Sequence, residues 1–101
     1  MKNAVIDLHQ AYIPSEDVVA RIIEGQLILV PLVAGPPETE GELYSLNDTG
    51  KIIWDRLDSE TSVNVLAEKL ANDFAIPVET MRNDIVGLLK ELLLRHIVRP
   101  A

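Results

Sequence analysis

The sequence contains no cysteine and few aromatic residues, and both absences limit what the protein can be. Without cysteine there is no disulfide framework and no thiolate metal site, and a reducing compartment is compatible with the composition. Aromatic residues make up only 4% of the 101 residues, whereas apolar residues make up 48%. The core must therefore consist mainly of leucine, isoleucine and valine. A chain of this length is expected to form one domain with a modest core.

Basic residues and long apolar runs are also scarce. The chain has 9 basic and 16 acidic residues, a formal net charge of -7. This balance argues against a nucleic-acid partner, because binding a duplex depends on neutralising phosphates. The longest apolar run, residues 27–35, is too short to span a bilayer, and the N-terminus lacks the apolar segment of a signal peptide. We expect a cytoplasmic protein that does not enter a membrane.

No residue pattern indicates catalysis or metal binding. His9 and His96 lie near opposite ends of the chain and have no metal-ligand spacing. Asp55, Asp58 and Glu60 fit a solvated helix end better than a catalytic pair, because no adjacent group would separate their pKa values. Phosphate-binding and nucleophile motifs are absent. The sequence therefore predicts a protein that is not an enzyme and has no catalytic residues, cofactor or metal.

Three short strands are expected in the first half of the chain. Residues 1–17 are expected to form a loose lead-in that is partly ordered at best and packs partly on the domain, with a disordered tail as the alternative. Residues 18–32 have the composition of a hairpin, with Gly25 in its turn. Residues 33–42 form a loop rich in glycine, proline and glutamate, and a third strand follows at residues 43–46.

Three helices are expected in the second half. The first covers residues 48–57 and can be capped by Asp48 or Thr49, the second covers residues 62–74, and the third covers residues 78–96. Strands followed by helices indicate an α+β fold. The arrangement resembles a winged helix-turn-helix, with a three-stranded antiparallel sheet followed by three helices. We place this domain at residues 18–98.

The third helix has a wider apolar surface than one packed side requires. It is either sandwiched between two layers or exposed on one flank to a partner. A winged-helix protein that binds DNA or regulates transcription is one alternative, but the helix offers Glu79 and Asp84 as well as Arg82 and Asn83. An obligate oligomer that covers the spare flank is another.

The third strand indicates a different kind of recognition. It is expected at a sheet edge, where unpaired backbone groups can be completed by an extended peptide. Alternation predicts that Tyr44 and Leu46 point inward, and Ser45 outward. Trp54, with Ile53 and Leu57, is assigned to the core rather than to a ligand platform.

The string SLNDTGKIIWDRLD, followed by TSVNVLAEKLANDFAIPVETMRNDIVGLLKELLLRHIV, resembles the PqqD family. The strongest part is the pattern LN-x-x-G-x-x-IW-x-x-LD, residues 46–58, and the resemblance extends over residues 18–98. The prototype takes part in the biosynthesis of pyrroloquinoline quinone. The loop at residues 33–42 is longer than the prototype's turn, and the lead-in is poorly covered.

The resemblance implies a peptide-binding winged-helix domain, the RiPP recognition element, where RiPPs are ribosomally made and enzymatically modified peptides. Such a domain binds the leader segment of a precursor peptide as an added strand and presents it to a modifying enzyme, commonly a radical S-adenosylmethionine (SAM) protein. We expect a monomer or weak homodimer; the sequence does not specify the peptide, the enzyme or the product. Arg82 is expected to pair with an acidic leader residue. The implied peptide-binding residues are Leu43, Tyr44, Ser45, Leu46, Met81, Arg82, Ile85, Leu88 and Leu89.

Overall fold

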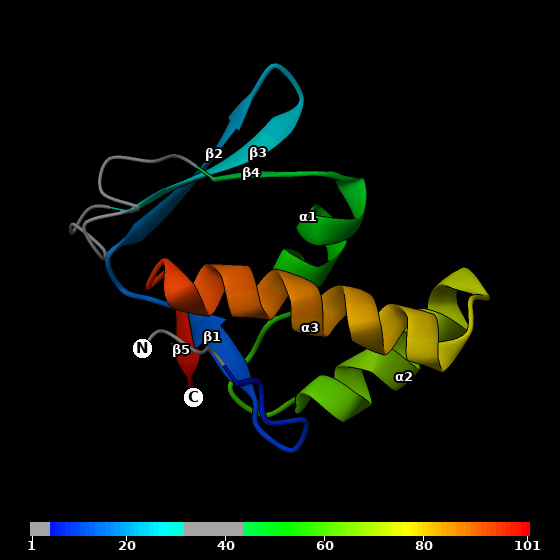
Figure 1. The fold of residues 1–101 in the computed structure, drawn as a ribbon. Coiled ribbons are helices and arrows are strands. Elements are labelled where there is room, and N and C mark those ends of the chain that lie inside the picture. Colours follow the sequence, from blue (N-terminus) through cyan, green and yellow to red (C-terminus); the bar gives the residue numbers. More distant parts are fainter. Residues whose placement is uncertain (1–4, 32–43) are drawn as a thin grey trace.

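The computed structural model describes residues 5–31 and 44–101, with the strands and helices arranged around one long central helix (Figure 1). Leu43 and the predicted loop at residues 33–42 lie outside the described residues. The elements in chain order are β1 (Tyr12–Pro14), β2 (Val18–Ile23), β3 (Gln26–Pro31), β4 (Tyr44–Leu46), α1 (Asp48–Asp55), α2 (Val63–Phe74), α3 (Val78–Leu94) and β5 (Val98–Pro100).

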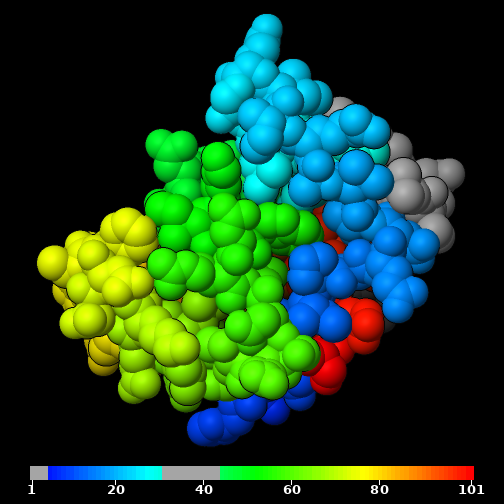
Figure 2. Space-filling model, turned by 180° about the vertical axis from the view of Figure 1, so that it is seen from behind, coloured from blue at the N-terminus to red at the C-terminus, as the bar shows by residue number. Residues whose placement is uncertain are grey.

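The main sheet is antiparallel with the strand order β2-β3-β4. The β2–β3 hairpin turns through Glu24 and Gly25, whose φ values are 51° and 82°. Two successive residues with positive φ form the tight turn that matches the twist of a hairpin. The predicted turn at Gly25 is therefore confirmed. The hairpin projects from the rest of the molecule (Figure 2).

The register of β3 and β4 directs one face of the sheet toward the helices. Leu27 pairs with Leu46, and Leu29 pairs with Tyr44. Leu27, Leu29 and Leu46 are buried and Tyr44 is half-buried, whereas Ser45 is exposed. The alternation predicted for this strand is confirmed.

Helix α3 forms the centre of the core and packs against α2 on one side (Figure 1). The two helices bury leucine, isoleucine and alanine side chains in a common cluster that also includes Ile53 of α1. The predicted α+β fold, with a three-stranded sheet and three helices, is confirmed. Helices α1 and α3 each end two residues earlier than predicted, at Asp55 and Leu94.

A second, two-stranded sheet joins the lead-in to the C-terminus, which the sequence did not predict. Strands β1 and β5 pair antiparallel, with Tyr12 opposite Pro100. The Tyr12 side chain is 4% exposed, and its hydroxyl accepts a hydrogen bond from the Asp7 amide at 3.0 Å. Ile6 is also in the core cluster. Part of residues 5–17, including strand β1, therefore packs on the domain.

The turn between β4 and α1 explains the LN-x-x-G part of the sequence pattern. Asn47, rather than Asp48 or Thr49, caps α1: its backbone is extended, and its Oδ1 accepts a hydrogen bond from the Gly50 amide at 2.7 Å. A Cβ atom at Gly50 would lie 3.2 Å from both Asn47 Oδ1 and Leu46 Cδ2. Leucine, asparagine and glycine at these positions therefore produce a tight link from strand to helix.

Behind this link, Ile53 is fully buried, whereas Trp54 and Leu57 are half-buried against the core. Helix α1 thus attaches the end of β4 to α3. Within the described residues, no helix combines the length and apolar character needed to cross a membrane.

Candidate functional site: a groove between β4 and α3

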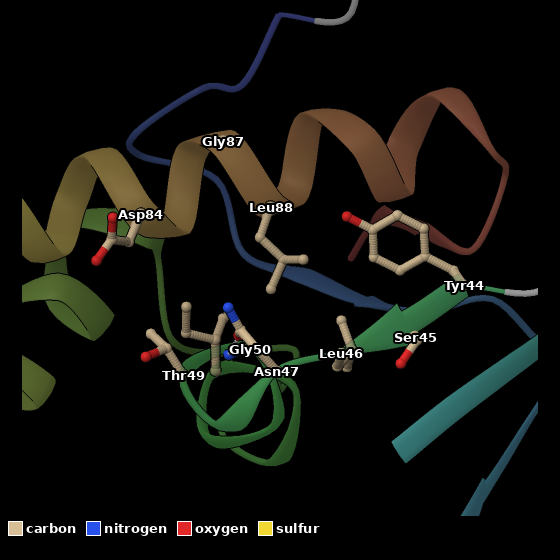
Figure 3. A pocket seen from close by; sticks show the side chains of 10 residues that line it. Tyr44, Ser45, Leu46, Asn47, Thr49, Gly50, Asp84, Gly87 and Leu88 are labelled. Carbon is tan, nitrogen blue, oxygen red and sulfur yellow. Dashed lines mark hydrogen bonds between the residues drawn. The ribbon is translucent and has the colours of Figure 1, made fainter. Parts of the chain in front are cut away.

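A groove of about 370 Å³ lies between β4 and α3 and ends at the start of α1 (Figure 3). Its volume falls within the range of small-ligand sites. The lining residues come from all three elements: Tyr44, Ser45, Leu46, Asn47, Thr49, Gly50, Ile53, Asp84, Gly87 and Leu88.

One wall of the groove is the outer edge of β4. Strand β4 is the last strand in the sheet order, and in the described parts of the chain no further strand pairs with it. An edge strand presents backbone N–H and C=O groups that an added strand can pair with. This wall can therefore bind an extended backbone without recognising its sequence.

The opposite wall is one face of α3. Asp84, Gly87 and Leu88 are spaced at i, i+3 and i+4, so they share this face. Leu88 is half-buried and points into the groove, whereas Asp84 is exposed at one end (Figure 3). Gly87 has open space beside it, because a Cβ atom built there meets no atom within 4 Å.

At the other end of the groove, Tyr44 lies beside α3 (Figure 3). The Arg95 guanidinium carbon lies 5.0 Å from the centre of the Tyr44 ring, within the range of a cation–π contact. Arg95 also forms an ion pair with Glu91 at 3.5 Å. These contacts fix the direction of the Tyr44 ring beside α3.

The structure brings together four of the predicted peptide-binding residues. Tyr44, Ser45, Leu46 and Leu88 all line the groove. The Ser45 hydroxyl donates to Gln26 Oε1 at 3.4 Å on the exposed side of the sheet, so Ser45 offers the groove its backbone. Leu43 lies outside the described residues.

The structure does not bring the other predicted α3 residues into the groove. Met81, Ile85 and Leu89 are at most 3% exposed and belong to the core cluster. Arg82 lies on the flank beside the N-terminal segment, where its Nε donates to Asn64 Oδ1 at 3.0 Å. A peptide in this groove would therefore meet Leu88 but not Arg82, Ile85 or Leu89, and Met81 lines only an adjoining hollow.

Six residues that line the groove were not predicted from the sequence: Asn47, Thr49, Gly50, Ile53, Asp84 and Gly87. Spacing could have found Asp84 and Gly87, because both share a helical face with Leu88. The α1 residues carry no comparable local signal, since their place in the groove depends on how α1 packs against α3.

Potential metal ligands do not cluster at the groove in the described parts of the chain. No group of three or more potential metal ligands occurs in residues 5–31 and 44–101. Hydrogen bonds from the Glu60 amide and the Thr61 hydroxyl and amide hold the pKa of Asp58 below its ordinary value. Asp58 does not line the groove, and these bonds order the loop before α2.

Comparisons with known proteins agree with this arrangement. The family model for coenzyme PQQ synthesis protein D (PqqD) matches residues 29–98, so the chain belongs to the PqqD family. No curated protein sequence matches the chain.

Two solved structures share the fold. One is the solution NMR structure of the PqqD truncation of Methylobacterium extorquens PqqCD, described as a functional, stand-alone RiPP recognition element. It has a TM-score of 0.72 at 16% identity, covering 94% of this chain and 95% of that one. The other is TbiB1 in complex with the TbiA(beta) leader peptide, with a TM-score of 0.67 at 18% identity, covering 86% and 94%.

Proposed function

We propose that the protein is a RiPP recognition element that binds the leader segment of a ribosomally made precursor peptide. The leader adds to the free edge of β4 as a further antiparallel strand and lies against α3. Backbone hydrogen bonds along β4 supply affinity, and the side chains of α3 and α1 supply selectivity. The protein then presents the peptide to a modifying enzyme and is itself no catalyst.

The observation that carries this proposal is the groove between an unpaired strand edge and an accessible helix face. The edge is already held in place by β3 and by the Asn47 cap of α1, so little ordering is needed when a peptide binds. Membership of the PqqD family and a fold shared with a protein bound to a leader peptide support the same function.

For the enzyme partner, family membership is the only support. We propose a radical SAM protein, in a pathway of the kind that produces pyrroloquinoline quinone. Purification of the tagged protein from cells of its source, followed by mass spectrometry of proteins and small peptides, tests this assignment. Recovery of a radical SAM enzyme with a short precursor supports it, and recovery of a different class of modifying enzyme contradicts it.

Strand addition can be tested by hydrogen exchange on the amides of the two free edges. Peptides selected from a displayed random library serve as the probe. We expect a bound peptide to slow exchange at residues 44–46, while the amides of β2 at the other edge keep their rates. Protection that appears on β2 alone, or on neither edge despite binding, would contradict addition to β4.

A matched pair of substitutions tests the same point on the protein. Ser45→Pro removes an amide from β4 and should abolish binding, because proline cannot donate to a strand ladder. Ser45→Val keeps the amide and favours a strand, so it should bind like the wild type. Circular dichroism must show intact helices in both variants. Undiminished binding by a folded Ser45→Pro protein would show that the backbone of β4 is not used.

A further inference from the structure

The groove continues past Asp84 into a second hollow of about 200 Å³. Thr49, Ile53 and Asp84 line both hollows, so the two adjoin. The remaining lining of the second hollow is entirely apolar and comes from Ile52, Phe74, Ile76 and Met81. A ligand that follows the groove away from Tyr44 therefore passes Asp84 before it reaches this apolar surface.

Asp84 is the single charged residue lining either hollow among the described residues. It is exposed and forms no ion pair with any residue in the described parts of the chain. No basic residue stands three or four positions away from it on α3. The Asp84 carboxylate is therefore available to pair with a cation from a ligand. The net charge of -7 also favours a positively charged ligand.

Apolar surface is available on each side of this carboxylate. On the groove side, Gly87 has open space in place of a side chain, and the apolar residues Leu46 and Leu88 line the same groove. On the other side, Phe74 at the edge of the second hollow is 46% exposed, an unusual environment for the chain's only phenylalanine. Together with Ile52, Ile76 and Met81, the Phe74 ring forms a concave apolar surface that can receive an apolar side chain.

We infer that the groove selects a peptide segment in which a lysine or arginine has a bulky apolar residue on each side. Asp84 pairs with the cation, the space at Gly87 receives one apolar side chain, and the hollow at Phe74 receives the other. This inference rests on the proposed function, because it specifies the sequence that the same groove would bind.

Helix and strand geometry set the spacing of the first two contacts. Asp84 and Leu88 are separated by about 6 Å along α3. Side chains on one face of a strand are about 6.7 Å apart at positions i and i+2. The space at Gly87 lies about 4.5 Å from Asp84 along α3, next to Leu88. Two positions along a strand is the nearest spacing that keeps both side chains on one face, so the basic residue should lie two positions from the apolar residue at Gly87 in the peptide. The second apolar residue lies beyond the end of β4, on the other side of the basic residue.

The test is a displayed library of random twelve-residue peptides, selected separately on the wild type and on three variants. Asp84→Lys should replace the basic preference by an acidic one and weaken a wild-type-selected peptide about fivefold. Gly87→Leu should remove the preference for a bulky residue at the neighbouring position. Phe74→Ala should reduce the preference for the second apolar residue.

Each variant has a control that makes the same kind of change on α2 or α3 outside both hollows. The controls are Glu79→Lys for the charge, Asn83→Leu for the added leucine and Val65→Ala for the truncated apolar side chain, which is 41% exposed. We expect all three controls to select the same peptides as the wild type. If Gly87→Leu fails to fold, Gly87→Ala provides the smaller substitution.

The outcomes separate this inference from the proposed function. Enriched peptides that protect β4 but are selected equally well by the three variants would overturn the inference alone. Failure of the wild type to enrich any peptide would overturn both. Enrichment of acidic rather than basic residues by the wild type would also overturn the inference.

Discussion

Two glycines in helices should respond to alanine with opposite signs, and the structure gives the reason for each. Gly50 lies in the first turn of α1 and Gly87 lies in the interior of α3. In a helix, alanine is favoured over glycine by about 0.5–1 kcal/mol, because glycine loses more backbone freedom on folding. Any departure from this gain must come from the space around the new Cβ atom.

At Gly50 that space is occupied. A Cβ atom would lie 3.2 Å from Asn47 Oδ1 and from Leu46 Cδ2, and 3.4 Å from Leu46 Cβ. Neither neighbour can move freely, because Asn47 is bonded to the Gly50 amide and Leu46 is 4% exposed. Crowding a packed site costs about 1–3 kcal/mol, and weakening the cap costs about 1 kcal/mol. Gly50→Ala should therefore destabilise the protein by about 1–3 kcal/mol after the helical gain is subtracted.

At Gly87 the space is open, so the helical gain should remain. Gly87→Ala should stabilise the protein by about 0.5–1 kcal/mol. Urea denaturation followed by the fluorescence of Trp54, the only tryptophan, measures both variants. A Gly50→Ala protein as stable as the wild type would refute the reasoning, because it would show that the β4–α1 link can relax around a methyl group.

Three further changes test the ends of the helices and the loop before α2. Ala75 ends α2 with a φ of 54°, so Ala75→Gly should raise the free energy of unfolding by about 1 kcal/mol in urea denaturation. Asn47→Ala removes the cap of α1 and should lower that free energy by about 1 kcal/mol in the same assay. Asp58 has a lowered pKa when folded, so it stabilises the protein above its ordinary pKa, and this contribution is lost as the pH falls through the folded value. Asp58→Asn should therefore reduce the loss of stability on acidification below about pH 4, measured by thermal denaturation across that range.

The elements that the sequence predicted are those with local signals. Gly25 indicates the hairpin turn, and Ser62, a residue type favoured at helix N-caps, caps α2 with its Oγ accepting from the Val65 amide. The β1–β5 sheet has no such signal, because it pairs Tyr12 with Pro100 across most of the chain. Such pairing depends on the tertiary fold, which composition does not reveal. For the same reason, strand β1 within the lead-in was not predicted.

The candidate site was only partly predictable for a physical reason. The peptide-binding residues predicted on α3 include Met81, Ile85 and Leu89 from its most apolar face. These side chains are buried in the core. Large apolar side chains are preferentially buried, so they indicate the interior before they indicate a ligand site. The groove instead uses the adjacent face, where Asp84 and Gly87 interrupt the apolar pattern.

Gly87, which interrupts the apolar pattern of α3, should affect both the stability of the protein and its binding of a peptide. A glycine in a helix interior lowers stability, and the open space beside Gly87 shows that no close packing within the described structure requires it. A methyl group there would gain helical stability while occupying the groove that the peptide is proposed to enter. Gly87→Ala should therefore make the protein more stable and weaken peptide binding at the same time. If this variant is more stable and binds the selected peptides with unchanged affinity, the space at Gly87 does not receive a peptide side chain.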